Sequence, residues 1–316
     1  MSTTVTAPAP SVAGAGSSGS NLPRLIRSEL LKIRTTNTWW IFLIGTVVFT
    51  ALPLALYVLL GNNSINDAVA GGGEPPTLDP DAPAGANQLA QQQWELSRDL
   101  HRVLITTAGN IYTSGQFFGL LFALLLGTLL MTNEYFHQTA TTTFLATPHR
   151  TLVIAAKLCT AVLAAAFFWL VTTVMDLATG ITFFSIKGYG SQLTEWPVTR
   201  AILLNGLAFG LWGILGVGLG VLIRSQIGAV LTGSLSYVIG TYLISTIATV
   251  IFVLTGQSWV LQAQVAWPGV ASQVMISPEP VLPNSPEWWV GALVLAGYGI
   301  VFGVIGTLLT RKRDIS

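Results

Sequence analysis

Six long apolar stretches limit the fold of this chain more than any other feature of its sequence. They lie at about residues 39–60, 113–132, 157–183, 201–223, 227–254 and 289–310. Each is long enough to cross a hydrocarbon layer of about 30 Å as a helix rising about 1.5 Å per residue. Only 9% of the residues are charged, against roughly a quarter in soluble domains. We therefore predict an all-α integral membrane protein with six transmembrane helices over residues 39–310.

Two segments precede the first stretch. Residues 1–20 contain no charged or aromatic side chain, so we expect a disordered tail that buries too little surface to offset its ordering entropy. Residues 21–38 predict a cytoplasmic amphipathic helix on the surface of an anionic bilayer. Its basic residues are Arg24, Arg27, Lys32 and Arg34, and its apolar face carries Leu22, Leu25, Ile26, Leu30 and Ile33. A solvated basic segment next to the membrane is the alternative.

The distribution of lysine and arginine predicts the orientation. One side of the six-span arrangement carries ten of these residues, including those of the basic tail 311–316, and the other side carries four. Because the side richer in lysine and arginine is normally cytoplasmic, we expect both termini and the loop 133–150 to be cytoplasmic. The outer loops are then 61–112, 184–200 and 255–288. Within the first, Asn87 to Leu104 has apolar residues at helical spacing and predicts an amphipathic helix that either leans on the outer surface or extends the second span.

The loop 133–150 has a specific order of residues. Glu134 closes the second apolar stretch, Thr139 to Leu145 has room for about two helical turns, and Pro148 ends them. Arg150 and Lys157 then carry positive charge into the third stretch, and Glu134 is a candidate ion-pair partner of Arg150. This order resembles the inner loop of type-2 ATP-binding-cassette (ABC) exporter permeases, in particular small six-span actinobacterial-like members. A polar turn between two spans is the alternative.

The resemblance implies a set of partners. The loop would couple the spans to a separately encoded ABC ATPase, present in two copies and holding ATP and Mg on its own chain. The coupling residues would be Glu134, Thr139, Thr143, Phe144, Leu145, Pro148 and Arg150. The permease would pair as a homodimer, or as a heterodimer with a homologue, in a bacterial plasma membrane. Residues 21–38 would be the connecting helix, and residues 257–287 a helical hairpin re-entering the outer leaflet; a folded extracytoplasmic cap is the competing interpretation of that segment.

The motifs of several other functional classes do not occur in the sequence. It contains neither GxxxxGK[ST], HExxH nor GxSxG, so we expect no catalytic residue, no metal site and no cofactor in this chain. Cys159 is the single cysteine and excludes an intrachain disulfide. The net charge of +1 gives no indication of a nucleic-acid partner. We therefore do not expect this chain to be an enzyme by itself.

Polar residues within the spans are candidates for a substrate path. The second span contributes Thr113, Gln116 and Phe117, the fifth Tyr237, Thr241 and Ser245, and the third the carboxylate of Asp176. The resemblance implies that the second and fifth spans line the exit route. Hydrogen bonding between helices is the alternative for the Ser and Thr residues, and a protonated or hydrogen-bonded packing role is the alternative for Asp176. Three GxxxG pairs, Gly206/Gly210, Gly216/Gly220 and Gly299/Gly303, predict tight helix packing.

The expected function is export of a hydrophobic or amphipathic substrate, such as a drug, an antibiotic or a lipid-like molecule, by alternating access. Two alternatives are an ion-coupled secondary transporter, which would favour several ionisable groups within the spans, and a membrane enzyme or stand-alone immunity protein.

Overall fold

The computed structural model describes residues 22–139, 150–280 and 286–312, and these contain helices but no strand. The elements are α1 (Leu22–Thr35), α2 (Thr38–Val69), α3 (Ala86–Arg98), α4 (Leu100–Tyr112), α5 (Gln116–Phe136), α7 (Arg150–Lys187), α8 (Trp196–Leu222), α9 (Gln226–Thr255), α10 (Trp259–Ala263), η1 (Gln264–Ala266), α11 (Pro268–Ile276) and α12 (Trp288–Lys312). Within these described ranges, six helical segments are long and apolar enough to span a membrane. The predicted all-α membrane fold is therefore confirmed.

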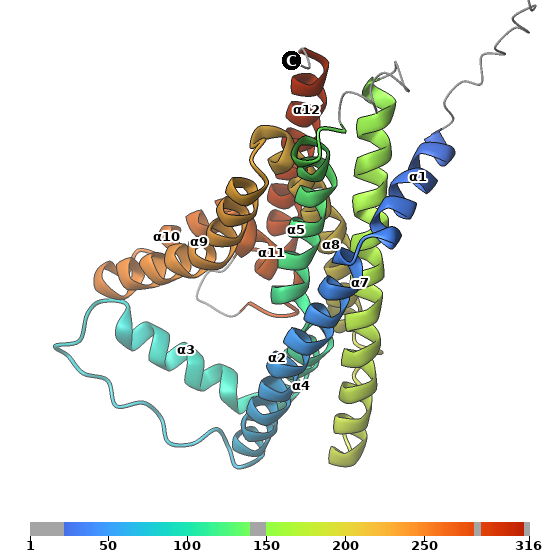
Figure 1. Ribbon diagram of the computed structural model, residues 1–316. Coiled ribbons are helices and arrows are strands. Elements are labelled where there is room, and N and C mark those ends of the chain that lie inside the picture. The colour runs from blue at the N-terminus through green and yellow to red at the C-terminus, as the bar shows by residue number, and fades with distance from the viewer. Residues whose placement is uncertain (1–21, 140–149, 281–285, 313–316) are drawn as a thin grey trace, which may run out of the picture.

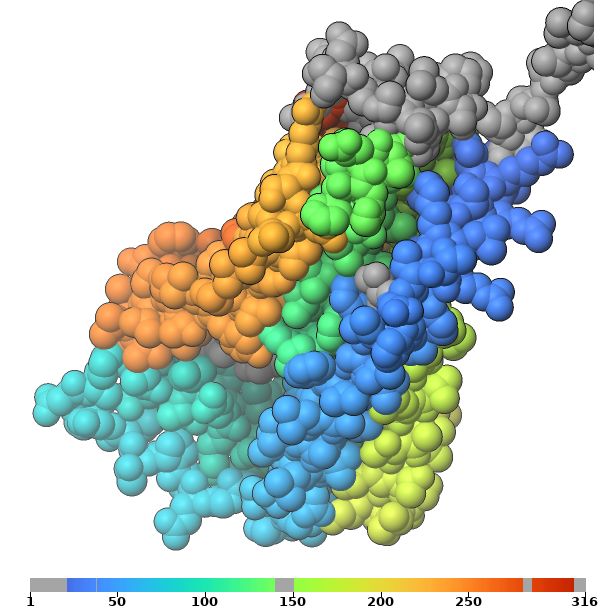
Figure 2. Space-filling model, viewed as in Figure 1, coloured from blue at the N-terminus to red at the C-terminus, as the bar shows by residue number. Residues whose placement is uncertain are grey.

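The helices form an elongated bundle with two distinct ends (Figure 1). One end, called the α1 end here, carries α1, the last turns of α5 and α12 and the first turns of α7. The opposite end, called the α3 end, carries α3, the last turns of α2 and the link between α7 and α8. In the space-filling view α1 and α2 run along one flank, while α9 with α10 forms a separate wing (Figure 2).

The core of the bundle is the contact between α5 and α8. Glycines bring the two backbones together: a Cβ on Gly216 would overlap the Leu124 carbonyl oxygen, and one on Gly220 would lie 2.7 Å from the Thr128 carbonyl oxygen. Without those side chains the helices pack closely enough for dispersion contacts to hold them, as is common where lipid removes the hydrophobic driving force. The tight packing predicted for this GxxxG pair is confirmed. Phe209 fills the same contact and is completely buried.

The second span is interrupted, which the sequence did not predict. It runs from Leu100 to Phe136 as two helices, α4 and α5, joined by Thr113, Ser114 and Gly115. The predicted helix Asn87 to Leu104 is divided between α3 and the first turns of α4, because the chain is extended at Asp99. Helix α4 extends the second span, which was one of its two predicted placements. The Asp99 carboxylate accepts the Arg102 N–H at 3.2 Å and so caps α4. Helix α2 also continues to Val69, which shortens the first outer loop.

The apolar, proline-rich segment before the last span enters the bundle. Helix α11 packs against α12, α8 and α9, whereas α10 lies against α9 (Figure 1). In α11, Ala271 and Met275 are completely buried, and Gly291 of α12 is so close that an added Cβ would overlap the Ala271 carbonyl oxygen. This arrangement is the predicted re-entrant hairpin, not a separately folded cap. A hydrogen bond ties α11 to α8, because the Trp212 indole N–H donates to the Ser272 hydroxyl at 2.7 Å.

Candidate functional site

Four charged side chains from three helices meet at the α1 end. Glu29 and Lys32 come from α1, Glu134 from the last turn of α5, and Lys157 from the second turn of α7. Lys157 Nζ lies 2.9 Å from Glu29 Oε2 and 2.9 Å from Glu134 Oε1. Lys32 Nζ lies 2.6 Å from Glu29 Oε1 and 2.8 Å from Glu134 Oε1. These four residues, the ion cluster, are two acids and two bases with no net charge.

Burial makes the ion cluster energetically significant. Lys157 has no exposed surface, and Glu29 and Glu134 are about 95% buried. A buried charge is tolerated only when it is paired and hydrogen-bonded, and Lys157 also donates to the Leu130 carbonyl oxygen at 3.0 Å. Removing one member would leave its partners as uncompensated buried charges, which is costly. Helix α1 is therefore fixed to α5 and α7, not only adsorbed on a membrane surface.

Lys32 is the member of the ion cluster that faces solvent, with about half of its side chain exposed. Burial of the other half lowers its pKa, but the hydrogen bonds to Glu134 and Glu29 outweigh burial, so the net effect raises the pKa above 10.5. The ammonium group of Lys32 is engaged by two carboxylates, and its membrane-surface role stays a prediction. Arg24, Arg27 and Arg34 are exposed on α1, as the predicted surface role requires.

A cavity of about 460 Å³ lies beside the ion cluster, between α1 and α5. Its walls include the apolar side chains of Ile33, Leu126 and Leu129, together with the polar side chains of Asn133 and His137. Glu134 Oε2 is buried here without a hydrogen-bond partner among the described residues.

The predicted coupling residues fall mostly outside the part of the chain that the structure describes. Thr143, Phe144, Leu145 and Pro148 lie in the undescribed segment 140–149. Thr139 is described and exposed, and its N–H donates to the Glu134 carbonyl oxygen at 3.0 Å. Arg150 begins α7, but its side chain is not among the described ones, so the predicted Glu134–Arg150 pair lies outside the described part of the chain and stays a prediction. The described ion-pair partners of Glu134 are Lys32 and Lys157.

Asp176 lies at the interruption of the second span. It is completely buried in α7, where its carboxylate accepts the Ser114 hydroxyl at 2.7 Å and the Gly115 N–H at 3.3 Å. These donors precede the first residue of α5, so the carboxylate caps the positive end of that helix. The contacts match the hydrogen-bonded packing role that the sequence left open for Asp176. Thr113, next to these donors, is buried and bonds the Gly109 carbonyl oxygen at 2.7 Å.

The other candidate path residues form two groups. The Tyr237 hydroxyl donates to the Phe117 carbonyl oxygen at 2.8 Å, and the two rings lie 5.2 Å apart. Gln116 donates to the Ser272 carbonyl oxygen of α11 at 3.0 Å, and Thr241 is buried against Gly269 of α11. Ser245 lies apart, in a second cavity with Thr249. The structure thus brings the second and fifth spans together through Phe117 and Tyr237, with α11 covering Gln116 and Thr241.

Sequence reasoning missed Glu29 of the ion cluster and Ser272 of α11, and it named Lys157 only as a positive charge entering the third apolar stretch. Glu29 falls on the apolar face of the amphipathic helix, three residues after Ile26 and four before Ile33, and an acid in that position signals a buried partner. Lys157 is a single base at the start of an apolar stretch, which is the matching signal. Ser272 had no local signal, because its partners Gln116 and Trp212 are distant in sequence.

Comparison of the sequence with known protein families gives no matching family model. A search of curated proteins likewise gives no significant match. The functional interpretation therefore depends on the geometry of the site and on the resemblance of residues 133–157.

Proposed function

We propose that this chain is the membrane-spanning permease subunit of an ATP-driven ABC exporter of the type-2 class. In this proposal the α1 end is cytoplasmic, and a separately encoded ATPase contacts the segment between α5 and α7. Two permease chains and two ATPase subunits form the transporter in the plasma membrane of a bacterium. The substrate is hydrophobic or amphipathic, and ATP and Mg are bound by the ATPase.

The observation that carries the proposal is the ion cluster. It joins α5 and α7, the two helices that flank residues 137–149, to the amphipathic helix α1. A force applied to the segment between α5 and α7 would therefore move three helices together. Buried ion pairs resist separation because each lost contact leaves a charge without a partner. This is the property that coupling to an external ATPase requires.

Co-purification and ATPase activity test the proposal. The full-length chain is isolated in mild detergent from the organism that encodes it, and the preparation is assayed for ATP hydrolysis and for a subunit carrying GxxxxGK[ST]. Phe144→Asp with Leu145→Asp should remove both, because the coupling surface would become charged. Leu78→Asp is the control, since Leu78 is an exposed apolar residue in the first outer loop. ATPase activity that survives in the double variant, or is lacking in the parent, contradicts the proposal.

Asp176 gives specific support to a second candidate, an ion-coupled transporter. Interrupted spans with buried ionisable groups commonly form ion sites, and no basic side chain among the described residues forms an ion pair with Asp176. Asp176→Asn distinguishes the two. If the chain is an ion-coupled transporter, this substitution should abolish transport driven by an ion gradient. If it is the permease of an ABC exporter, transport should still depend on ATP and not on the gradient.

A further inference from the structure

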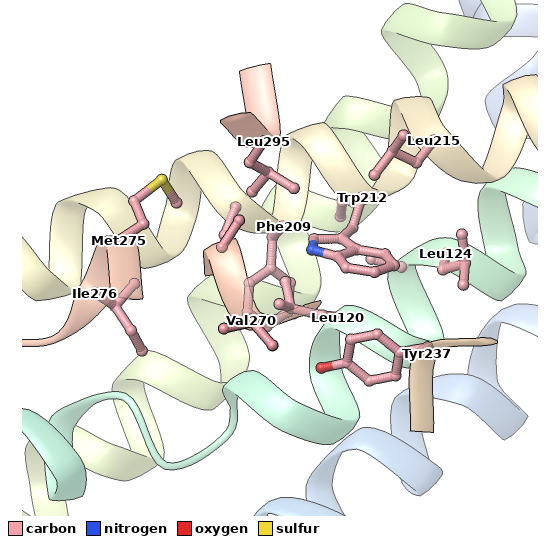
Figure 3. Close-up of a cluster of buried hydrophobic side chains, with 14 of the residues drawn as sticks. Leu120, Leu124, Phe209, Trp212, Leu215, Tyr237, Val270, Met275, Ile276 and Leu295 are labelled. Atoms are coloured by element: carbon pink, nitrogen blue, oxygen red, sulfur yellow. The ribbon is translucent and has the colours of Figure 1, made fainter. Parts of the chain in front are cut away.

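An aromatic crevice separates α9 from α12, away from the ion cluster. Its volume is about 260 Å³. Leu124 of α5 and Leu215 of α8 contribute to its floor, while Trp267 and Pro268 of the re-entrant segment also line it. The remaining aromatic lining residues are Trp212 of α8, Tyr237 of α9, and Tyr298 and Phe302 of α12. Trp212 and Tyr237 meet edge to face with their ring centroids 4.7 Å apart (Figure 3).

The polar atoms of three of these aromatic residues are already bonded elsewhere. Tyr237 donates to the Phe117 carbonyl oxygen at 2.8 Å, and Tyr298 to the Ala266 carbonyl oxygen at 3.0 Å. Trp212 donates to the Ser272 hydroxyl at 2.7 Å. These hydrogen bonds fix the orientation of the three rings, which present ring surface to the crevice. Trp267 differs, because its indole N–H is buried without a hydrogen-bond partner among the described residues. A preformed cavity with rigid aromatic walls is typical of ligand sites.

The rim of the crevice has a different chemistry. Thr232 and Ser236 of α9 are exposed lining residues, and between them Gly233 has no side chain to narrow the crevice. The neighbouring surfaces of α9 and α12 expose large apolar side chains, including Leu235 and Val301, which is typical of surfaces that face lipid. The crevice therefore opens on an apolar surface of the chain, with two hydroxyl groups at its edge.

We propose that the crevice binds the ring system of a planar, apolar molecule that carries one hydrogen-bonding group and enters sideways from the bilayer. The inference depends on the proposed transport function, because it assigns the substrate class of that function. Ligand sites usually measure roughly 300 to 1,000 Å³, so 260 Å³ suits one small fused-ring system. Aromatic walls favour a flat ring, whereas a flexible acyl chain loses rotamer freedom on ordering. The hydroxyls of Thr232 and Ser236 bond the polar group.

Binding of 1-aminoanthracene, a planar apolar fluorophore with one amine, tests the assignment. The full chain without an ATPase is placed in phosphatidylcholine nanodiscs, and energy transfer from its tryptophans to the probe is titrated. We expect saturable binding. Ser236→Phe should fill the crevice and raise Kd by about tenfold or more, and Leu231→Phe, on the opposite face of α9, should change Kd by less than about twofold.

Three outcomes would overturn the assignment. They are non-saturable partitioning by the parent chain, equal binding to Ser236→Phe and the parent, and full displacement of the probe by decanoate, which would indicate an acyl-chain site. Thr232→Leu serves as a second, smaller rim substitution if Ser236→Phe does not elute like the parent on gel filtration, and it should also weaken binding. The binding assay contains no ATPase, so it tests the crevice separately from the proposed function. Saturable binding of the probe by a chain that does not co-purify with an ATPase would support the crevice and contradict only the proposed function.

Discussion

At the scale of single residues, Lys157 has the strictest requirements. Its ammonium group has no exposed surface and relies on two carboxylates and one carbonyl oxygen. Two of these acceptors belong to α5 and one to α1, so a single side chain links three helices. Such a residue contributes little net stability compared with a well-packed apolar pair, but its removal alone is expensive.

The first prediction is that Lys157→Met lowers the free energy of unfolding by about 3 to 5 kcal/mol, since Glu29 and Glu134 then share one lysine. Thermal unfolding in detergent, followed by loss of the monodisperse gel-filtration peak, measures the effect. Lys187→Met is the control, because Lys187 lies at the other end of α7 and bonds Asn66 at 3.4 Å. Adding Glu134→Gln to Lys157→Met should recover part of the loss. Equal stability of Lys157→Met and Lys187→Met would contradict the buried role.

The second prediction concerns pH and Lys32. Its pKa in the folded chain is raised above the ordinary 10.5 by its two carboxylate partners, despite burial. A raised lysine pKa gives stability that is fully present below 10.5 and is lost as the pH rises through the folded-state value. The melting temperatures of the parent and of Lys32→Met should therefore differ by a constant amount from pH 8 to 10 and converge above that range. The melting temperatures of the parent and of the control Arg24→Met should not converge above pH 10. If they do converge, Lys32 is not the cause of the pH dependence.

At the scale of elements, the re-entrant helix α11 depends on glycine in its neighbours. Gly291 of α12 faces the backbone of α11, where an added Cβ would overlap the Ala271 carbonyl oxygen and lie 2.8 Å from Met275 N. Backbone atoms cannot rotate away as a side-chain end can. Gly297, six residues later in the same helix, has no atom within 4 Å of its Cβ position.

The third prediction is accordingly that Gly291→Ala destabilises the protein by about 1 to 3 kcal/mol through overpacking, while Gly297→Ala is neutral or slightly stabilising because alanine favours helix. Both variants differ from the parent by one methyl group in the same helix, so thermal unfolding compares them directly. If the two variants have similar melting temperatures, α11 moves away from the added methyl group without cost, and its close packing against Gly291 does not contribute to stability.

The elements also show how far the sequence could predict the fold. The six spans were predictable because length and apolarity are local properties of the sequence. The third stretch, predicted at 157–183, is found within α7, although that helix is longer and runs from Arg150 to Lys187. The interruption at Thr113–Gly115 was not, because it is stabilised by Asp176, about sixty residues later. The ion cluster combines Glu29 with Lys157, 128 positions apart, and neither residue specifies its partner by spacing. Pairing between distant helices is therefore what local periodicity cannot supply.

At the scale of the whole molecule, the two ends of the bundle differ in how they hold the spans. The α1 end uses the ion cluster. The α3 end uses separate ties: Arg102 of α4 lies 3.1 Å from Glu279 after α11, and the Gly85 N–H at the start of α3 donates to the Val253 carbonyl oxygen of α9 at 3.0 Å. Helix α3 thus connects α9 to the first two spans across one end of the bundle (Figure 1).

The final prediction assigns these ends to sides of the membrane. Ten of the fourteen lysines and arginines belong to the side of α1, the loop 133–150 and the C-terminus, and such an excess normally marks the cytoplasm. Cys159 is first replaced by Ala, which removes the single native thiol. Cysteines are then introduced separately at Gln92 in α3 and at Ser17, and intact cells are treated with a membrane-impermeant maleimide. Gln92→Cys should react in intact cells, whereas Ser17→Cys should react only after the cells are permeabilised. Reaction of Ser17→Cys in intact cells would place the ion cluster outside, where no ATP is present, and would contradict both the orientation and the proposed coupling to an ATPase.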